Sequence, residues 1–185
     1  MSHYRREPIN GATWFFTIVT HQRRSFLCDE PVRVALRNAI KRVQLKHPFE
    51  IDAWVLLPDH FHCVWTLPDE DSNFKLRISL LKRYVTLQCA AVLHRDQLTS
   101  ASRRKRKEST IWQRRFWEHR ICDDEDLKNH LDYIHYNPVK HGHCKTPIEW
   151  PYSTLHRLTQ CGKYPANWAS HTEPNINQTT NYGDP

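Results

Sequence analysis

The sequence predicts an α+β domain, because segments with strand-like and helix-like hydrophobic patterns alternate along its 185 residues. The segments 49–57 and 60–67 are adjacent and each alternates residue by residue, which predicts a β-hairpin. The segments 29–47 and 73–92 repeat apolar residues every three or four positions, as amphipathic helices do. A chain of this length is expected to form one hydrophobic core.

The first expected strand lies at 13–20, which is rich in aromatic and β-branched residues. Asp29 can cap the first helix and Asn73 begins the second, after the hairpin. The basic stretch 99–110 has no periodicity and predicts a mobile loop. The segment 111–121 then alternates large apolar with charged residues, which predicts a fourth strand.

A third helix is expected after the fourth strand, with Asp123 as its cap and Pro138 ending or kinking it. The resulting order is that of a ferredoxin-like β-α-β-β-α-β antiparallel sheet with an additional C-terminal helix that carries a tyrosine. Such a sheet has two helices on one face and leaves the other face free. We expect one domain, 1–164, followed by a loosely held polar tail, 165–185.

Charge and composition narrow the classes of function. Lys and Arg total 27 against 20 Asp and Glu, and the excess of +7 favours a polyanionic partner such as nucleic acid. No apolar run could span a membrane and no signal peptide is recognisable, so a cytoplasmic protein without a membrane partner is expected. The six cysteines include no C-x-x-C pair and are expected to stay reduced. With only four glycines the chain forms neither a phosphate-binding loop nor a dinucleotide fingerprint, which argues against use of ATP or NAD.

Two histidines on the third expected strand are candidate metal ligands. His60 and His62 are two positions apart, so their imidazoles point to the same side of the sheet while Phe61 points into the core. Two imidazoles on one face can bind one divalent cation, and an oxygen as third ligand would move the preference toward manganese or magnesium. The alternative is a pair of half-exposed histidines that bind nothing, and the spacing alone favours that alternative.

The third expected helix adds a phenol and an amide. Tyr133 and Asn137 are four residues apart and share one helical face, with Lys140 a further turn along. That face could border the histidines and bring a nucleophile, an amide oxygen and a cation together. Otherwise Tyr133 is a packed residue whose hydroxyl finds a partner. The apolar stripe expected to pack the helix against the protein is a different face, formed by Leu127, Leu131 and Ile134.

The motifs HFHCVW at 60–65 and DYIHYNPVKHG at 132–142 resemble those of the HUH single-tyrosine transposases, and most closely those of the REP-associated tyrosine transposases. The likeness extends to the stretches YRR, GATWFFT, FEIDAWVLLPDHFHCVWTLP, IWQRRFWEH and WPYSTLHR, and leaves out the basic loop and the tail. The resemblance implies that His60 and His62 are the paired metal ligands, that Tyr133 is the nucleophile and that Asn137 is the third metal ligand.

This family acts on single-stranded DNA that carries hairpins from repetitive extragenic palindromes (REP), with Mg²⁺ or Mn²⁺. The resemblance therefore implies an endonuclease and strand transferase that forms a covalent 5′-phosphotyrosine intermediate and releases a free 3′ hydroxyl. One ester replaces another, so no nucleotide fuel is needed. The base for the phenol stays open between a metal-bound water, His135 and a lysine. The family also implies a monomer, with a helix-exchanging dimer as the alternative, and a nucleoid-associated location.

Basic and aromatic residues are candidates for holding DNA. Trp112, Trp117 and Tyr4 could stack unpaired bases, although core packing is expected for each tryptophan. The basic run RRKRK could equally be a solvated loop. The candidate phosphate contacts are Arg5, Arg6, Arg23, Arg24, Arg103, Arg104, Lys105, Arg106, Lys107, Arg114, Arg115 and Lys140.

Two other functions fit parts of the sequence. A ferredoxin-like sheet with aromatics is also how RRM-type domains hold RNA, so a noncatalytic single-stranded nucleic-acid-binding module is the alternative. A zinc site of His141, His143 and Cys144 has suitable ligand types but no second pair at a matching spacing. The joint presence of two histidines, the tyrosine and the asparagine favours the transposase.

Overall fold

The computed structural model describes residues 9–176 and 180–184. Its strands and helices in the described residues are β1 (Thr13–Val19), α1 (Glu30–Lys46), β2 (Glu50–Leu56), β3 (His60–Thr66), α2 (Phe74–Leu93), α3 (Ala101–Lys105), β4 (Trp117–Arg120), α4 (Asp124–Lys140) and α5 (Leu155–Gln160). Short 3-10 helices lie at His21–Arg23, Asp96–Leu98 and Pro147–Glu149.

The four strands form one antiparallel sheet in the order β2-β3-β1-β4. The central strand β3 pairs with β1 on one side and with β2 on the other, which places His62 opposite Thr17 and His60 opposite Val19. This order is the one that the ferredoxin-like series produces, so the predicted α+β class is confirmed.

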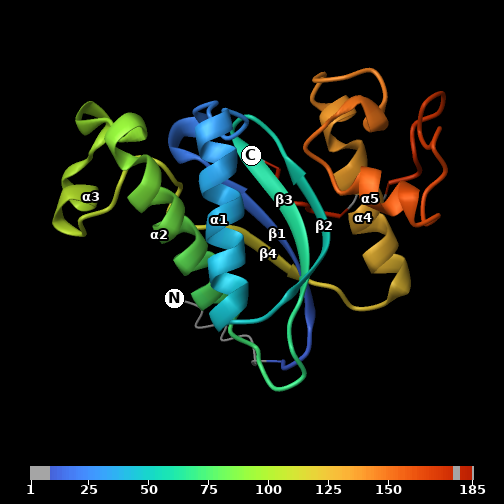
Figure 1. Ribbon diagram of the computed structural model, residues 1–185, viewed down its shortest axis with the longest axis horizontal. Coiled ribbons are helices and arrows are strands. Elements are labelled where there is room, and N and C mark those ends of the chain that lie inside the picture. The colour runs from blue at the N-terminus through green and yellow to red at the C-terminus, as the bar shows by residue number, and fades with distance from the viewer. Residues whose placement is uncertain (1–8, 177–179, 185) are drawn as a thin grey trace.

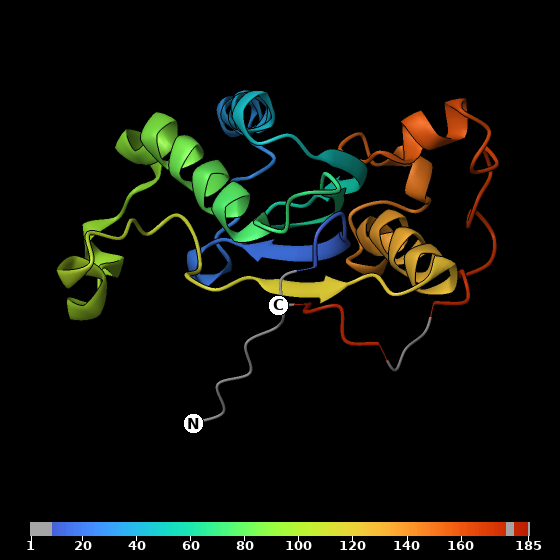
Figure 2. The ribbon, with the colours of Figure 1, turned by 90° about the horizontal axis from the view of Figure 1, so that it is seen from below.

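One face of the sheet carries α1 and α2 (Figures 1 and 2). Alternate residues of β1 and β3 point to these helices and are almost fully buried, including Phe16, Ile18, Phe61 and Trp65. The side chains that α1 and α2 contribute are aliphatic or aromatic as well, so this face is a dry apolar core.

The opposite face is not free, contrary to the expectation from the sequence. Helix α4 covers it, and Figure 1 shows α4 and α5 on the side of the sheet away from α1 and α2. Ile134 of α4 is fully buried against Phe15 and Val64 of the sheet. The stripe Leu127, Leu131 and Ile134 therefore packs as predicted, and covers the face that bears the histidines.

The region between α2 and α4 differs from its prediction. The basic stretch includes the helix α3, in which the Ser100 side chain accepts a hydrogen bond from the Arg103 N–H. The fourth strand is shorter than 111–121, since β4 spans Trp117–Arg120. Trp112 is buried as expected, but Trp117 is 38% exposed, so core packing was the wrong expectation for Trp117.

Helix ends follow the predicted caps in two of three cases. Asn73 and Asp123 accept hydrogen bonds from the third N–H of α2 and α4 respectively. Asp29 occupies the N-cap position of α1, but its side chain makes no capping bond. Helix α4 continues through Pro138 and ends at Lys140, so the proline lies in the last turn and does not itself end the helix.

The tail is partly held rather than loose. Tyr182 is only 7% exposed and belongs to the cluster beneath α4, and the Thr17 hydroxyl donates a 2.7 Å hydrogen bond to its carbonyl. Gly183 lies against the indole of Trp117, where a Cβ would come within 2.2 Å of the ring. The segment 180–184 thus lies against the sheet (Figure 2).

Candidate active site

His60 and His62 each use Nδ1 to contact a neighbouring side chain and leave Nε2 for the site. The Nδ1 atom of His60 lies 2.7 Å from Asp59 Oδ1, and that of His62 lies 2.8 Å from Thr17 Oγ1. Because the single Thr17 hydroxyl proton is donated to the Tyr182 carbonyl, His62 Nδ1 must carry its own proton. This leaves Nε2 of His62 as a lone pair, and Nε2 of His60 has no hydrogen-bond partner among the described residues.

The charge states suit ligand roles. Burial lowers the pKa of His62 to about 4, so that its imidazole is neutral near pH 7. Burial alone would raise the pKa of Asp59, but hydrogen bonds from His60 and Arg23 outweigh it and hold this pKa far below its ordinary value. Asp59 is therefore an anion that keeps the proton of His60 on Nδ1.

Tyr133 and Asn137 stand beside these histidines, on α4. The Tyr133 ring lies 5.2 Å from the His62 ring, and the two histidine rings are 4.8 Å apart. Asn137 is fully buried, and neither its amide oxygen nor its amide nitrogen has a hydrogen-bond partner among the described residues. The structure thus brings together His60, His62 and Tyr133, and Asn137 lies one turn along α4 from Tyr133. Buried polar atoms without partners are costly, which fits a centre built for a metal ion.

Two residues of the tail occupy the same space. The Tyr182 ring stacks on the Tyr133 ring at 3.8 Å and 7°. The Tyr133 hydroxyl and the Lys140 ammonium both donate to the Asp184 carboxylate, which also lies 3.3 Å from His62 Nε2. Burial, followed by the charge of Asp184, raises the pKa of Tyr133 well above its ordinary value. In this arrangement the phenol is protonated and covered.

Sequence reasoning missed several residues of this site. Thr17 and Asp59 fix the histidine tautomers, and Tyr182 and Asp184 close the site. The position of Asp59 directly before His60 is a signal that could have identified it. Nothing in the local pattern indicated the other three, because each reaches the site through long-range pairing.

His135 lies outside the site. Its Nε2 atom is 3.1 Å from Thr154 Oγ1, and its ring packs against Tyr164 and Trp168. Burial lowers its pKa to about 3. This placement does not support His135 as the base for Tyr133.

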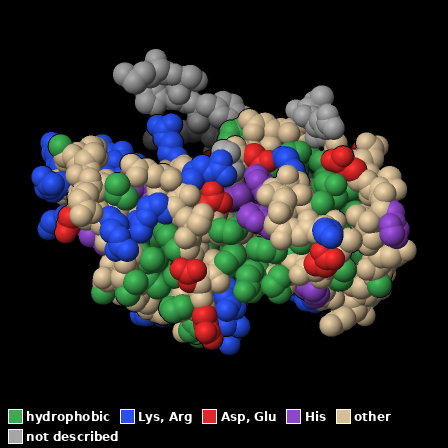
Figure 3. All heavy atoms as spheres, turned by 90° about the horizontal axis from the view of Figure 1, so that it is seen from above, with side chains coloured by type: hydrophobic (Ala, Val, Ile, Leu, Met, Phe, Trp, Pro, Cys, Tyr) green, Lys and Arg blue, Asp and Glu red, His purple; other side chains and the backbone are tan. Residues whose placement is uncertain are grey.

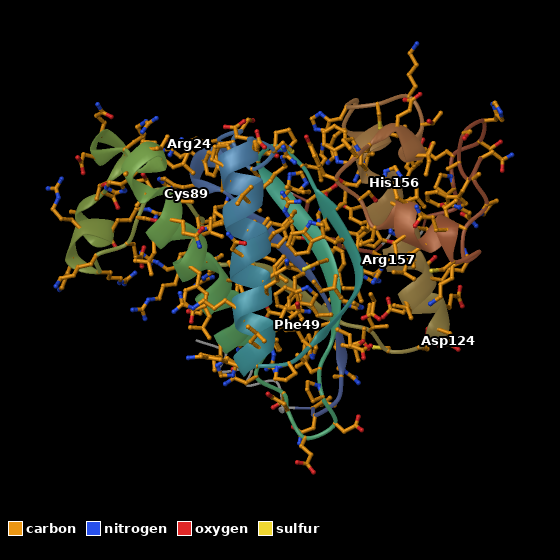
Figure 4. All side chains as sticks on the ribbon, in the orientation of Figure 1. Arg24, Phe49, Cys89, Asp124, His156 and Arg157 are labelled. Carbon is orange, nitrogen blue, oxygen red and sulfur yellow. The ribbon has the colours of Figure 1, made fainter. Side chains whose placement is uncertain are left out.

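A second group of ligand-type side chains joins β4 to α4. Nε2 of His119 lies 2.8 Å from Asp126 Oδ2, and Nδ1 of His130 lies 3.0 Å from Oδ1 of the same carboxylate. The two histidine rings stack at 4.6 Å. Asp126 Oδ2 also accepts from the Cys122 N–H at 2.9 Å, and His130 Nδ1 is hydrogen-bonded to the Asp126 backbone carbonyl at 2.8 Å, so the group ties the first turns of α4 to the sheet (Asp124 marks this end of α4 in Figure 4).

The described candidate phosphate contacts fall into three sets. Arg24 donates to the carbonyls of Leu93 and Thr110, and Arg103 to those of Ser109 and Trp112, so these two side chains hold the α2 end and the following loop together (Figure 4 labels Arg24). Three others form ion pairs: Arg23 with Asp59, Arg114 with Glu108, and Lys140 with Asp184. The third set, which is exposed and for which no ion pair is described, consists of Arg104, Lys105, Arg106, Lys107 and Arg115.

Arg5, Arg6 and Tyr4 lie outside the described residues. Figure 3 shows Lys and Arg gathered toward the end of the molecule that carries α3. None of the described helices is long and apolar enough to cross a membrane. All six cysteines are free thiols.

Comparison with known proteins agrees with this geometry. The family model described as "Transposase IS200 like" matches residues 11–137. The chain is 44% identical over 169 residues to the REP-associated tyrosine transposase of Escherichia coli K12, covering 91% of this chain and 92% of that protein. It is equally identical, over 177 residues, to a relative from Haemophilus influenzae, covering 95% and 98%.

A solved structure of a REP-associated tyrosine transposase bound to a REP hairpin has a similar fold. It is 43% identical to this chain, superimposes with a TM-score of 0.77, and the match covers 96% of this chain and 100% of the other. The pairing of a two-histidine strand with a tyrosine helix, on this fold and at this level of identity, places the chain in the REP-associated tyrosine transposases, within the IS200-like transposase family.

Proposed function

We propose that this enzyme is a metal-dependent single-stranded DNA endonuclease and strand transferase that acts on REP-type hairpin DNA through a 5′-phosphotyrosine on Tyr133. The observation that carries the proposal is the Tyr133 ring 5.2 Å from His62, in a space where buried imidazole and amide atoms have no hydrogen-bond partner among the described residues. The hairpin substrate is inferred from the related transposase that was solved with a REP hairpin.

The residues of the site fit a divalent cation. Nε2 of His60, Nε2 of His62 and the amide oxygen of Asn137 are all buried, and imidazole with an amide oxygen suits Mg²⁺ or Mn²⁺ at a phosphate. When bound, the ion would withdraw charge from the nonbridging oxygens of the scissile phosphate. Thr17 and Asp59 orient the two imidazoles for this task.

The covalent step belongs to Tyr133. Its phenolic oxygen gives up its proton and attacks the phosphorus, the bond from phosphorus to the 3′ oxygen breaks, and that oxygen takes up a proton and leaves as a 3′ hydroxyl, so that one proton in all passes from the phenol to the 3′ oxygen. One phosphodiester is exchanged for another, so attack by a second 3′ hydroxyl reverses the step and transfers the strand. Asp184 must leave Tyr133 first, because its charge helps to raise the pKa of the phenol. Lys140, 5.0 Å from the Tyr133 ring centre, then becomes available to the incoming phosphate.

One chain is enough to build this centre, since β3 and α4 of the same molecule supply all four residues. We therefore infer a monomer as the working unit, which light scattering of the protein with and without hairpin DNA would measure. Action on chromosomal repeats would place the enzyme with the nucleoid in the cytoplasm. Exposed basic residues near α3 are the proposed phosphate contacts, so higher salt should weaken hairpin binding.

The RNA-binding alternative is disfavoured by the sheet itself. An RRM-type domain stacks bases on an open sheet face, whereas α4 and Tyr182 cover this face here. Phe15, the aromatic residue at the middle of that face, is fully buried.

The test uses end-labelled single-stranded DNA with a REP-type hairpin, incubated with Mn²⁺ and resolved on a denaturing gel. Tyr133→Phe is expected to abolish the slow-migrating protein–DNA adduct while hairpin binding in a native gel stays within twofold. Tyr136→Phe is the matched control, because it removes a hydroxyl three residues away on the same helix and should form the adduct normally. An undiminished adduct from Tyr133→Phe removes Tyr133 from the nucleophile role.

A further inference from the structure

A third histidine faces the candidate metal centre from the end of α4. His141 follows Tyr133 and Asn137 by eight and four positions, so the three side chains lie in one row along the helix. Its backbone N–H closes the last turn by donating to the Asn137 carbonyl at 3.0 Å. The row thus runs from the phenol through the amide to an imidazole.

The His141 ring is directed toward β3. It lies 5.3 Å from the His60 ring at an interplanar angle of 70°. Ligand atoms of His60, His141 and Asp184 all lie within 4.8 Å of one another. Its neighbour His143 instead stacks on Trp150 at 5.2 Å. This geometry departs from the zinc site considered from the sequence, because His141 turns to the strand histidines rather than pairing with Cys144.

The His141 side chain has a free ligand atom in the right place. Its Nε2 atom is buried and has no hydrogen-bond partner among the described residues, as is also true of Nε2 in His60, whereas Nε2 of His62 lies 3.3 Å from Asp184 Oδ1. Groups that face His141 are His60, Asp184, Lys140 and His143. Ligand atoms of His60 and His141 that lie within 4.8 Å of each other and of Asp184, while Nε2 of both rings has no hydrogen-bond partner among the described residues, are better explained by a shared cation than by independent unsatisfied groups.

We propose that His141 is a further ligand of the metal centre, so that three imidazoles and the Asn137 amide oxygen select Mn²⁺ over Mg²⁺. The inference rests on the proposed function, since it adds a ligand to that same centre. Imidazole nitrogen favours first-row transition ions, whereas Mg²⁺ prefers a shell of oxygens. The third imidazole therefore sets the choice of metal more than the ability to bind one.

The experiment measures Mn²⁺ affinity on the full chain without DNA, from the free-Mn²⁺ signal in electron paramagnetic resonance, and then displaces the ion with Mg²⁺. His60→Ala and His141→Ala are each expected to weaken Mn²⁺ binding at least tenfold. His143→Ala, in the same loop, is the matched control and should bind as the unmodified chain does. His141→Gln keeps a polar side chain but replaces nitrogen with an amide oxygen, so less Mg²⁺ should be needed to displace Mn²⁺.

The outcomes separate this inference from the proposed function. If His60→Ala loses Mn²⁺ affinity while His141→Ala and His141→Gln stay within twofold of the unmodified chain, His141 is only a helix-end residue packed on His60 and the inference is overturned. If His60→Ala also keeps its affinity, the metal centre of the proposed function fails with it. Melting temperatures measured without metal, together with the milder glutamine variant, identify any loss that is due to unfolding.

Discussion

The two faces of the sheet are built from different chemistry. The face beneath α1 and α2 is closed by Phe61, Trp65 and aliphatic side chains, and its sheet residues are apolar. The face beneath α4 buries His60, His62 and Asn137 without satisfying all of their polar atoms. Burial of apolar area stabilises a fold, whereas buried polar atoms without partners cost free energy. The first face therefore stabilises the fold, and the second carries the groups of the candidate site at some cost in stability.

The largest expected effect comes from exchanging one side chain on each face of β3. Phe61→Ala should lower the free energy of unfolding by about 3–5 kcal/mol, because its buried ring packs on Trp54 at 4.3 Å. His62→Ala should abolish the DNA adduct and lower the unfolding free energy far less. Urea denaturation and the adduct gel measure the two effects. Equal destabilisation by both variants would remove the proposed difference between the faces.

Lowering the pH should lower the free energy of unfolding, through a buried histidine of α4. Burial lowers the pKa of His135 to about 3 in the folded chain, whereas the ordinary value is about 6.5. Between these two pH values the unfolded chain binds a proton at His135 and the folded chain does not. The stability that His135 contributes is therefore present above pH 6.5 and is lost as the pH falls toward 3. The loss is about 2 kcal/mol at pH 5, at 1.36 kcal/mol per pH unit.

This pH effect is measured as the difference in urea stability between pH 7 and pH 5. His135→Asn should flatten the dependence by that amount, whatever its stability at pH 7. His143→Asn, which changes an exposed histidine, should leave the slope as it is. If His135→Asn leaves the slope unchanged, folding does not lower the pKa of His135, and this prediction is wrong.

A smaller effect is expected from the tail. Asp184→Asn removes the charge that raises the pKa of Tyr133 and weakens the contact with Lys140, so the rate of adduct formation should rise by about 3- to 10-fold, or roughly 1 kcal/mol. Glu173→Gln is the control, since it neutralises another carboxylate in the tail. A slower reaction in Asp184→Asn would mean that the carboxylate assists the chemistry instead of covering the phenol.

The sequence was sufficient where the pattern is local. Alternation along β3 placed both imidazoles on one face, and four-residue spacing on α4 placed Tyr133 and Asn137 on another, so the only step left was to bring the two faces together. The apolar stripe of α4 supplied that step, because packing the stripe on the sheet carries the neighbouring row of side chains with it.

The sequence was insufficient where contacts depend on register or on distant chain segments. Thr17 meets His62 across 45 residues and Tyr182 across 165, and neither separation leaves a trace in hydrophobic periodicity. The expectation that one face of the sheet is free was wrong for a related reason. The stripe of the third helix was recognised, but the face it would cover depends on the path of the chain after β4, which pattern alone does not determine.

The central claim, that strand imidazoles and a helix phenol form one centre, is tested most directly by peptide mapping of the trapped complex. The protein is incubated with hairpin DNA and Mn²⁺, the DNA is trimmed to a nucleotide stub, and tryptic peptides are sequenced by tandem mass spectrometry. We predict a 5′-phosphate stub on Tyr133 alone, and none in a His60→Ala, His62→Ala double variant. A stub on another tyrosine, or one that persists without the two imidazoles, would contradict the account.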